Sequence, residues 1–227
     1  MGLVGATGTQ GPLGPAGLGI DRAGFTRTAL DGNFGGRYSS IAVTIGGDGL
    51  GVITYSPFRQ LAVAHCSNLA CTASTHTIVD SAGEVGEWSS ITTGNDGLGL
   101  ISYLDRTHGA LKVAHCSNAE CSSATTNTID MGNTGGFTSI AIGADGLGLI
   151  TYEPPQTNTG PVMVAHCSHA TCSSATATTL DPSGLFGTSD AVGVDGLPLV
   201  AYYNVAEREL DVVHCSNVFC VPYFRRR

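Results

Sequence analysis

Residues 94–103 read GNDGLGLISY, and the same ten-residue pattern occurs at three other places in the chain. The copies are GGDGLGVITY at 46–55, GADGLGLITY at 143–152 and GVDGLPLVAY at 193–202. Their aspartates, Asp48, Asp96, Asp145 and Asp195, recur with a period of about 50 residues, which is the length of a four-stranded propeller blade. The repeat therefore predicts an all-β fold made of four similar units.

Each unit divides into four short strands. The first precedes an Asp-Gly pair, which favours a tight two-residue hairpin turn, and the second follows it, as in LGLISY. The third carries the pattern VAHCS, and the fourth resembles STHTIVD at 74–80. Helical periodicity is absent, and glycine and proline recur too often for helices of ordinary length.

The fourth strands indicate how the units close. FTRTALD at 25–31 aligns with STHTIVD, so that the aspartates ending these strands fall at 31, 80, 130 and 181. An N-terminal strand that completes the last blade is how closed propellers join their ends, and closure removes exposed sheet edges. We expect a four-bladed β-propeller over residues 21–227, with repeats of about 37–80, 81–130, 131–181 and 182–220 and with strand 25–31 completing the last blade. An open array of four repeats taken from a larger ring is the alternative.

The repeats, which span residues 25–220, resemble β-propeller repeats of secreted bacterial proteins of the lectin and sialidase-like kind. Sialidase-like catalysis would require inward arginines, an acid and a tyrosine nucleophile, and the Asp-box pattern S-x-D-x-G-x-T-W is absent. No nucleophile elbow, Walker loop or H-E-x-x-H motif occurs either. We therefore expect a protein that is not an enzyme, with no catalytic residues and no cofactor.

All eight cysteines occur as Cys-x-x-x-x-Cys, once in each unit, between the third and fourth strands. Two cysteines that flank a tight β connection can reach the separation that a disulfide requires. Zinc held by the cysteines and the neighbouring histidine is disfavoured, because adjacent residues on a strand point to opposite faces. Free thiols are the third alternative. We expect four disulfides: Cys66–Cys71, Cys116–Cys121, Cys167–Cys172 and Cys215–Cys220. We expect the four neighbouring histidines to be packing or hydrogen-bonding residues between blades: His65, His115, His166 and His214.

Residues 2–19 are six consecutive Gly-x-y triplets, GLV GAT GTQ GPL GPA GLG. Glycine at every third residue is required where three polyproline-II strands meet, and the segment resembles collagen-like segments of secreted bacterial and viral proteins. We expect residues 1–20 to be a collagen-like tail, the end of a longer stalk that makes the protein a homotrimer. A flexible Gly/Pro linker is the alternative.

Composition and charge limit which partners and which cellular compartment we expect for the protein. Only 12% of the residues are charged, and the net charge of −8 argues against nucleic acid or an anionic membrane surface as a partner. No run of about 18 apolar residues predicts a membrane-spanning helix, so we expect no membrane insertion. The first residues lack the regions of a signal peptide, so we expect another secretion route or a piece of a longer protein. The disulfide pattern favours an extracellular place, on a cell or virion surface.

The loops that differ between units all lie on one face of the expected ring, as on a binding surface carried by a rigid support. Four aromatic residues recur there near the start of the first strand of each unit, and we take them as ligand-binding candidates: Tyr38, Trp88, Phe137 and Phe186. Packing between blades is the alternative role for these rings. On the opposite face, the four repeat aspartates could hold a cation, although their Asp-Gly turns explain them without a metal.

We therefore expect an extracellular, non-catalytic module that recognises a glycan or a surface protein, in the manner of a lectin. A structural subunit of an extracellular or virion-surface fibre is the alternative. The sequence assigns no role to the tail Arg225–Arg227.

Overall fold

A computed structural model of the chain describes residues 27–31, 40–155, 160–182 and 185–221. In these residues, fifteen strands form four antiparallel sheets, which confirms the all-β class and the four units, and the short 3₁₀-helix η1 spans Pro57–Arg59.

The first sheet contains β1 (Ile41–Ile45), β2 (Gly51–Tyr55), β3 (Leu61–Cys66) and β4 (Ser74–Asp80). The second contains β5 (Val85–Thr93), β6 (Gly99–Asp105), β7 (Ala110–Cys116) and β8 (Ala124–Met131). The third contains β9 (Gly136–Ile142), β10 (Gly148–Glu153), β11 (Val162–Cys167) and β12 (Ala175–Asp181). The fourth contains β13 (Leu185–Val192), β14 (Pro198–Asn204) and β15 (Glu209–His214).

The Asp-Gly hairpins form as predicted, but with a longer loop than two residues. In the first unit Ile45 pairs with Gly51, and the Gly49 amide donates to the Gly46 carbonyl at 2.9 Å. Only the glycine has positive φ, 81°, so the aspartate stays in ordinary backbone space. This is the arrangement of a type I turn followed by a left-handed glycine.

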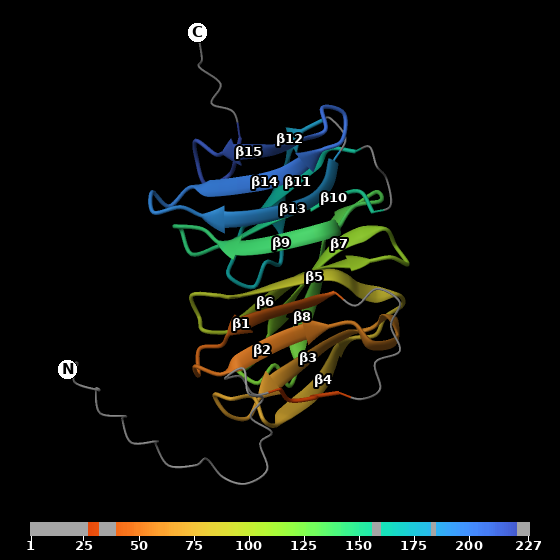
Figure 1. The fold of residues 1–227 in the computed structure, drawn as a ribbon, viewed down its shortest axis with the longest axis vertical. Helices are drawn as coiled ribbons and strands as arrows, with labels where there is room; N and C mark the ends of the chain where they lie inside the picture. Colours follow the sequence, from red (N-terminus) through yellow and green to blue (C-terminus); the bar gives the residue numbers. More distant parts are fainter. Residues whose placement is uncertain (1–26, 32–39, 156–159, 183–184, 222–227) are drawn as a thin grey trace, which may run out of the picture.

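The inner strands β1, β5, β9 and β13 lie side by side, and the sheets extend away from them like blades (Figure 1). Between the first two sheets, Val52, Leu61 and Val63 pack against Ile101 and the other buried residues of the second sheet. Each inner strand also bonds to the next, as in the hydrogen bond of 2.7 Å from Thr138 Oγ1 to the Trp88 carbonyl. Interdigitated cores of this kind fix the angle between neighbouring sheets.

A tyrosine of the second strand in each unit reaches back to the aspartate that ends the preceding outer strand. Its hydroxyl donates to that carboxylate at 2.7–3.2 Å in four pairs: Tyr55–Asp31, Tyr103–Asp80, Tyr152–Asp130 and Tyr202–Asp181. Burial of the rings, followed by the adjacent carboxylates, raises the pKa of all four phenols, that of Tyr55 to about 12. The Tyr55–Asp31 pair puts residues 27–31 where the outer strand of a sheet before the first would lie.

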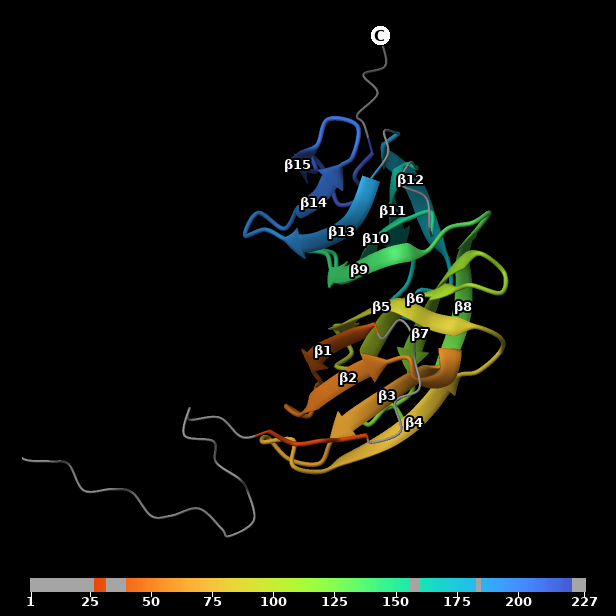
Figure 2. The ribbon, with the colours of Figure 1, turned by 45° about the vertical axis from the view of Figure 1, so that its right-hand side comes forward.

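The four sheets form an open array and not the ring closed within one chain that the sequence predicted. Residues 27–31 lie at the end of the molecule that carries β2 and β4, whereas β15 lies at the opposite end in both views (Figures 1 and 2). The sheet of β13, β14 and β15 has three strands in the part of the chain that the structure describes. The packing between neighbouring sheets fixes the rotation from one sheet to the next. Over four sheets this rotation does not bring the first and the last sheet together. The expected closure by residues 25–31 is therefore corrected to an open arrangement.

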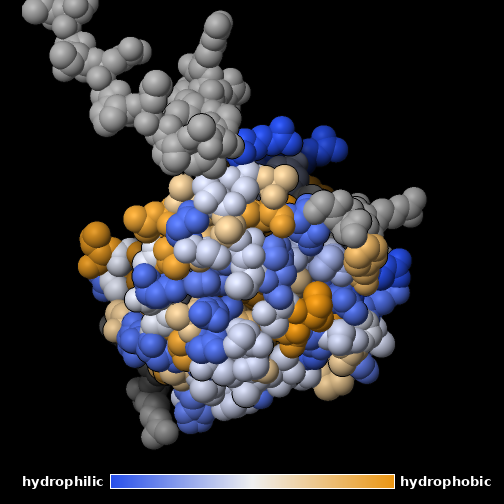
Figure 3. Space-filling view, turned by 90° about the horizontal axis from the view of Figure 1, so that it is seen from below, coloured by the Kyte–Doolittle hydropathy of each residue, from blue (hydrophilic) through white to orange (hydrophobic). Residues whose placement is uncertain are grey.

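Apolar side chains lie uncovered at both ends of this array. Figure 3 views the end that carries the first sheet, where apolar residues reach the surface among polar ones. In the first sheet, Ile41, Val43 and Ile45 of β1 are 59–65% exposed. At the other end, Leu210 and Val212 of β15 are 71% and 56% exposed.

Four disulfides join the eight cysteines in the predicted pairs, with Cα–Cα distances of 4.8–4.9 Å. Stapling within each unit is therefore confirmed, and both the zinc and the free-thiol alternatives for the cysteines are wrong. Among the residues with described structure, no helix has the length and apolar character to cross a membrane. The predicted collagen-like tail at 1–20 and Arg225–Arg227 lie outside the described residues.

Candidate functional site

Two of the four aromatic candidates, Trp88 and Phe137, lie at β-bulges near the start of β5 and β9. The pairing register with the neighbouring strand shifts at both places. Trp88 has φ 49° and Phe137 has φ 46°, in the left-handed region that residues other than glycine rarely adopt. A bulge redirects a side chain, and residues held in such backbone conformations concentrate at binding and catalytic sites. The two bulges therefore mark this edge as a candidate site.

A glycine two residues before each of these aromatic residues allows the chain to reach the bulge. Gly86 and Gly135 have φ of +89° and +92°, and a Cβ on either would lie 2.8 Å from the Cα of Leu61 or Leu111. Only glycine fits so close to the backbone of the preceding sheet. The chain therefore crosses directly over that sheet before it presents the aromatic residue.

The Trp88 and Phe137 rings stack on each other across the boundary between the second and third sheets. Their centroids are 4.7 Å apart, their planes are inclined by 24°, and both side chains are half-buried. The Arg106 guanidinium lies 5.5 Å from the centroid of the Trp88 ring, and its Nε donates to Glu87 Oε2 at 2.9 Å. The result is a flat apolar pair beside an arginine and a buried carboxylate.

A second buried carboxyl group, that of Glu153, lies at the same edge. Glu153 pairs with Gly136, the residue before Phe137, and is 2% exposed. Its Oε1 accepts a hydrogen bond of 2.9 Å from the Gly187 amide, while its Oε2 has no partner among the described residues. Burial raises the pKa of Glu153 to about 7, and the hydrogen bond from Gly187 offsets only part of this effect. The group can therefore hold or release a proton near neutral pH.

The other two aromatic candidates are not placed with this pair. Tyr38 lies outside the described residues, and so does the side chain of Phe186. The backbone of Phe186 lies in β13 immediately before Gly187, which has φ +83° at the register shift of that strand. The fourth unit thus has glycine where the second and third have Trp88 and Phe137.

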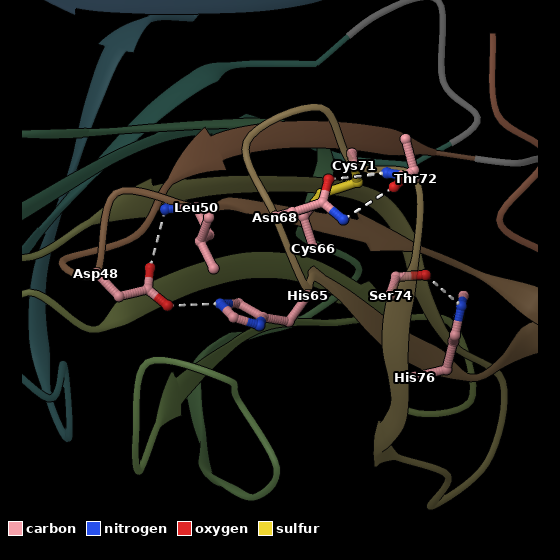
Figure 4. Close-up of a disulfide and its surroundings, with 9 residues drawn as sticks. All are labelled: Asp48, Leu50, His65, Cys66, Asn68, Cys71, Thr72, Ser74 and His76. Carbon is pink, nitrogen blue, oxygen red and sulfur yellow. Dashed lines mark hydrogen bonds and ion pairs between the residues drawn. A yellow bond between two sulfur atoms is a disulfide. The ribbon is translucent and has the colours of Figure 1, made fainter. Parts of the chain in front are cut away.

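The repeat aspartates and histidines form structural pairs. Asp48 Oδ1 accepts from the Leu50 amide at 3.0 Å, and its Oδ2 lies 2.8 Å from His65 Nε2 (Figure 4). The same 2.8 Å pairing occurs in the other units: His115–Asp96, His166–Asp145 and His214–Asp195. Each pair joins the first turn of a unit to its own third strand, so these histidines hydrogen-bond within their sheets and not, as expected, between blades. The His166 ring also packs on the next unit, with its centroid 4.4 Å from that of Phe219. No group of three potential metal ligands occurs in the described ranges.

Arg106, Glu87 and Glu153 were missed in the sequence, although a comparison of the units could have found Glu153. Its counterparts at the same distance from the repeat aspartate are Ser56, Leu104 and Tyr203. A carboxyl group at a position that is otherwise occupied by neutral residues is a usable signal. Glu87 carries the same signal, since its counterparts are Ser39, Gly136 and Phe186, but nothing in the sequence indicates its contact with Arg106.

A comparison with known proteins finds no matching family model and no matching curated protein. Among solved structures, a protein of unknown function from Dyadobacter fermentans matches with a TM-score of 0.61 and 9% identity, over 84% of this chain and 65% of that one. An endo-1,4-β-xylanase from Bacteroides thetaiotaomicron matches with a TM-score of 0.55 and 12% identity, over 79% and 72%. An α-L-arabinofuranosidase from Lactobacillus brevis matches with a TM-score of 0.52 and 10% identity, over 84% and 77%. At this identity the similarity establishes the fold, a propeller-type array of antiparallel sheets.

The expectation that the protein is not an enzyme is contradicted by these comparisons. Two of the three structures are enzymes, a xylanase and an arabinofuranosidase, so this fold carries catalytic sites. The motifs whose absence led to the expectation are the sialidase Asp-box and three short catalytic signatures. Their absence excludes those patterns only, and not carboxylates brought together from different sheets.

Proposed function

We propose that the protein binds a glycan at the edge formed by Trp88 and Phe137. The observation that carries this proposal is the stacked, half-buried aromatic pair held by two left-handed bulges. Flat aromatic faces stack on apolar ring faces, while the charged groups of Arg106 and Glu87 can hydrogen-bond to hydroxyl groups. Sugar rings offer both kinds of surface.

Similarity to a xylanase and an arabinofuranosidase supports a glycan as the ligand, by analogy of fold. The four disulfides support a place outside the cell, on a cell or virion surface. We propose that residues 1–20 join three copies through a collagen-like stalk, which would multiply weak sites by avidity.

Trp88→Ala is expected to weaken glycan binding at least about tenfold, because one stacking ring is worth about 1.4 kcal/mol or more. Purified protein is screened on a glycan array, and the affinity for each bound glycan is then measured by calorimetry. Phe219→Ala is the matched control, since this ring is 45% exposed on the opposite face, in the Cys215–Cys220 loop. Equal affinity of wild type and Trp88→Ala, or an equal loss in both variants, would contradict the site. Absence of binding on a broad array would favour the fibre subunit.

Hydrolysis of a glycosidic bond is a second candidate function, and Glu153 is the observation that favours it. A carboxyl group with a pKa of about 7 is protonated in a useful fraction at neutral pH and can act as a general acid. Glu87, fixed by Arg106, is the second carboxyl group at this edge. Glycosidases use two carboxyl groups in this way.

Glu153→Gln is expected to lower turnover of any cleaved glycan at least about 100-fold, the usual contribution of a general acid. Glycans that bind on the array are incubated with the protein, and products are followed by mass spectrometry between pH 5 and 8. Glu120→Gln, which changes an exposed carboxylate, is the control. Turnover that survives in Glu153→Gln would remove Glu153 from the reaction.

A further inference from the structure

The fourth sheet presents, uncovered, the same positions that the other sheets bury against their next neighbour. Leu199, Leu210 and Val212 are 42%, 71% and 56% exposed. Aligned on the repeat aspartate for Leu199 and on the His-Cys pair of the third strand for Leu210 and Val212, the first sheet has Val52, Leu61 and Val63, which are 0–2% exposed. The end of the array is therefore an interface of the kind used between its sheets, without its partner.

The first sheet presents the complementary surface. Val43 of β1 is 65% exposed, whereas its counterparts Ile91 and Ile140 are 7% and 6% exposed because each packs on the preceding sheet. Both ends are thus halves of one repeated interface.

The hydrogen bonds between inner strands continue this pattern. The Ile140 amide donates to Ser90 Oγ at 3.3 Å, and the Asp190 amide donates to Ser139 Oγ at 3.1 Å. The next serine in the series is Ser189 of β13, which is exposed. The backbone amide that occupies the position of the Ile140 and Asp190 donors in the first unit is that of Val43, at the other end of the array.

In the part of the chain that the structure describes, the fourth sheet also has no outer strand, and the chain holds a spare one at its other end. Residues 27–31 are bound to the first sheet through Asp31 and Tyr55, as the outer strands of preceding sheets are bound in the other units. A cavity of about 160 Å³ separates Leu30 and Asp31 from Ile41 and Ile53. A second, of about 190 Å³, lies between β12, the end of β15 and the Cys215–Cys220 loop, and is lined by Leu180, Val213 and Cys220. An incoming sheet would fill the first cavity, and an incoming strand the second.

We propose that a second copy of this chain docks head to tail, with its fourth sheet against the first sheet of its neighbour. Residues 27–31 of one copy then become the outer strand beside β15 of the other. The occupant is a second copy and not the chain's own fourth sheet, because three packed interfaces hold the two ends on opposite sides of the molecule (Figure 1). Head-to-tail interfaces build a ring when the rotation closes. Assembly removes both exposed apolar faces and the open edge of β15.

The register of this exchanged strand follows from the first sheet. There Thr77 pairs with Val63 and Ile78 with Ala62, so the aligned residues Thr28 and Ala29 should pair with Val212 and Asp211. Directly opposed residues alternate between close and wide pairs in an antiparallel sheet. One of these two predicted residue pairs is therefore a close pair, and the Cα–Cα separation of a close pair suits a disulfide.

The test is disulfide trapping in the full chain. Thr28→Cys and Val212→Cys are made as separate single variants and co-expressed, and Ala29→Cys with Asp211→Cys provides the other register. A disulfide-linked dimer from either co-expressed pair is the expected result, read on a non-reducing gel and by mass spectrometry. The double variants are also made in one chain. A link that forms only within single chains would show self-closure and overturn the proposal, and so would the absence of any link.

A second measurement does not depend on cysteine. Leu210→Asp with Val212→Asp should reduce the mass in solution by light scattering, at an unchanged circular dichroism spectrum, because both side chains are exposed within one chain. Leu69→Asp is the control, since this residue is 89% exposed in the Cys66–Cys71 loop and lies outside the two faces. The expected fall in mass holds whether or not residues 1–20 also join copies. A double variant with the wild-type mass would overturn the proposal.

Discussion

Lys112→Met is expected to lower the free energy of unfolding at neutral pH by about 3–5 kcal/mol, the cost of leaving buried carboxylates without their cation. Lys112 Nζ lies 2.5 Å from Asp80 Oδ2 and 4.0 Å from Asp105 Oδ2, and the three side chains are 5–11% exposed. Tyr103 also donates to Asp80 at 2.7 Å. Lys112 is the sole lysine of the chain, and it joins the outer strand of the first sheet to the second sheet. Urea unfolding followed by circular dichroism measures the loss.

The pH dependence of this loss is a sharper test than its size. Burial opposes ionisation of Asp80, but the hydrogen bonds from Lys112, the Ala82 amide and Tyr103 outweigh it and lower the pKa. Such a group stabilises the fold above its unfolded pKa of 3.8, and the contribution is lost as pH falls through the folded value. In Lys112→Met, protonation should relieve the unpaired carboxylates, so the difference from wild type should shrink toward pH 3–4.

The control for Lys112→Met is Arg59→Met, which removes an equal charge from the exposed Arg59–Glu84 pair, whose side chains are 61% and 40% exposed. Exposed pairs contribute at most about 1 kcal/mol. Equal effects of the two substitutions, or a loss in Lys112→Met that does not vary with pH, would show that Lys112 acts through packing alone.

Stability is expected to fall as pH rises from about 4 to 7, because two buried carboxyl groups bind protons more tightly in the folded chain. Burial raises the pKa of Glu153 from 4.5 to about 7 and that of Asp190 from 3.8 to about 6. Hydrogen bonds from Gly187 to Glu153, and from Ser139 and Thr151 to Asp190, lower the values only in part. Both groups lie between the third and fourth sheets, and each has one oxygen without a partner in the described part of the chain.

The sign of this effect follows from the folded and unfolded pKa values. Below about pH 4 both states are protonated and the groups have no effect; as pH rises, the unfolded chain loses its protons first and is favoured. Each shift corresponds to about 3 kcal/mol once the folded group is also ionised. The window lies above that of Asp80, so the two effects can be separated.

Glu153→Gln and Asp190→Asn should each remove part of the decline, and each variant should exceed wild type in stability at pH 8 by up to about 3 kcal/mol. Glutamine keeps an acceptor for the Gly187 amide. Melting temperatures are measured by calorimetry from pH 4 to 8, with Glu120→Gln as the exposed control. Variant and wild-type curves that run parallel would refute the assignment of these groups.

These buried acids bear on the proposed function. The third and fourth sheets meet through Glu153 and Asp190, where the counterparts of Asp190 are Val43, Ile91 and Ile140. Burying carboxyl groups in place of apolar side chains destabilises the fold at neutral pH, and such groups concentrate at functional sites. If Glu153→Gln loses turnover and gains stability, Glu153 is both a catalytic residue and a residue that destabilises the fold at neutral pH.

The sequence by itself determined the features that depend on neighbours along the chain. Strand alternation, the glycine in the turn after each repeat aspartate and the short cysteine spacing predict the sheets, the hairpins and the disulfides. These signals are local, because a turn or a six-residue disulfide loop involves no distant segment. The aromatic residues could also be found this way, since Trp88 and Phe137 recur at one position in the repeat.

Only the tertiary structure decided which distant groups share a site and whether the array closes. Lys112 meets Asp80 from 32 residues away, and Gly187 meets Glu153 from 34, through sheets that pack side by side. Closure depends on the angle between sheets, which is set by the sum of many side-chain contacts and not by any one motif. A small difference in that angle, repeated at three interfaces, separates a closed ring from an open array with two uncovered ends.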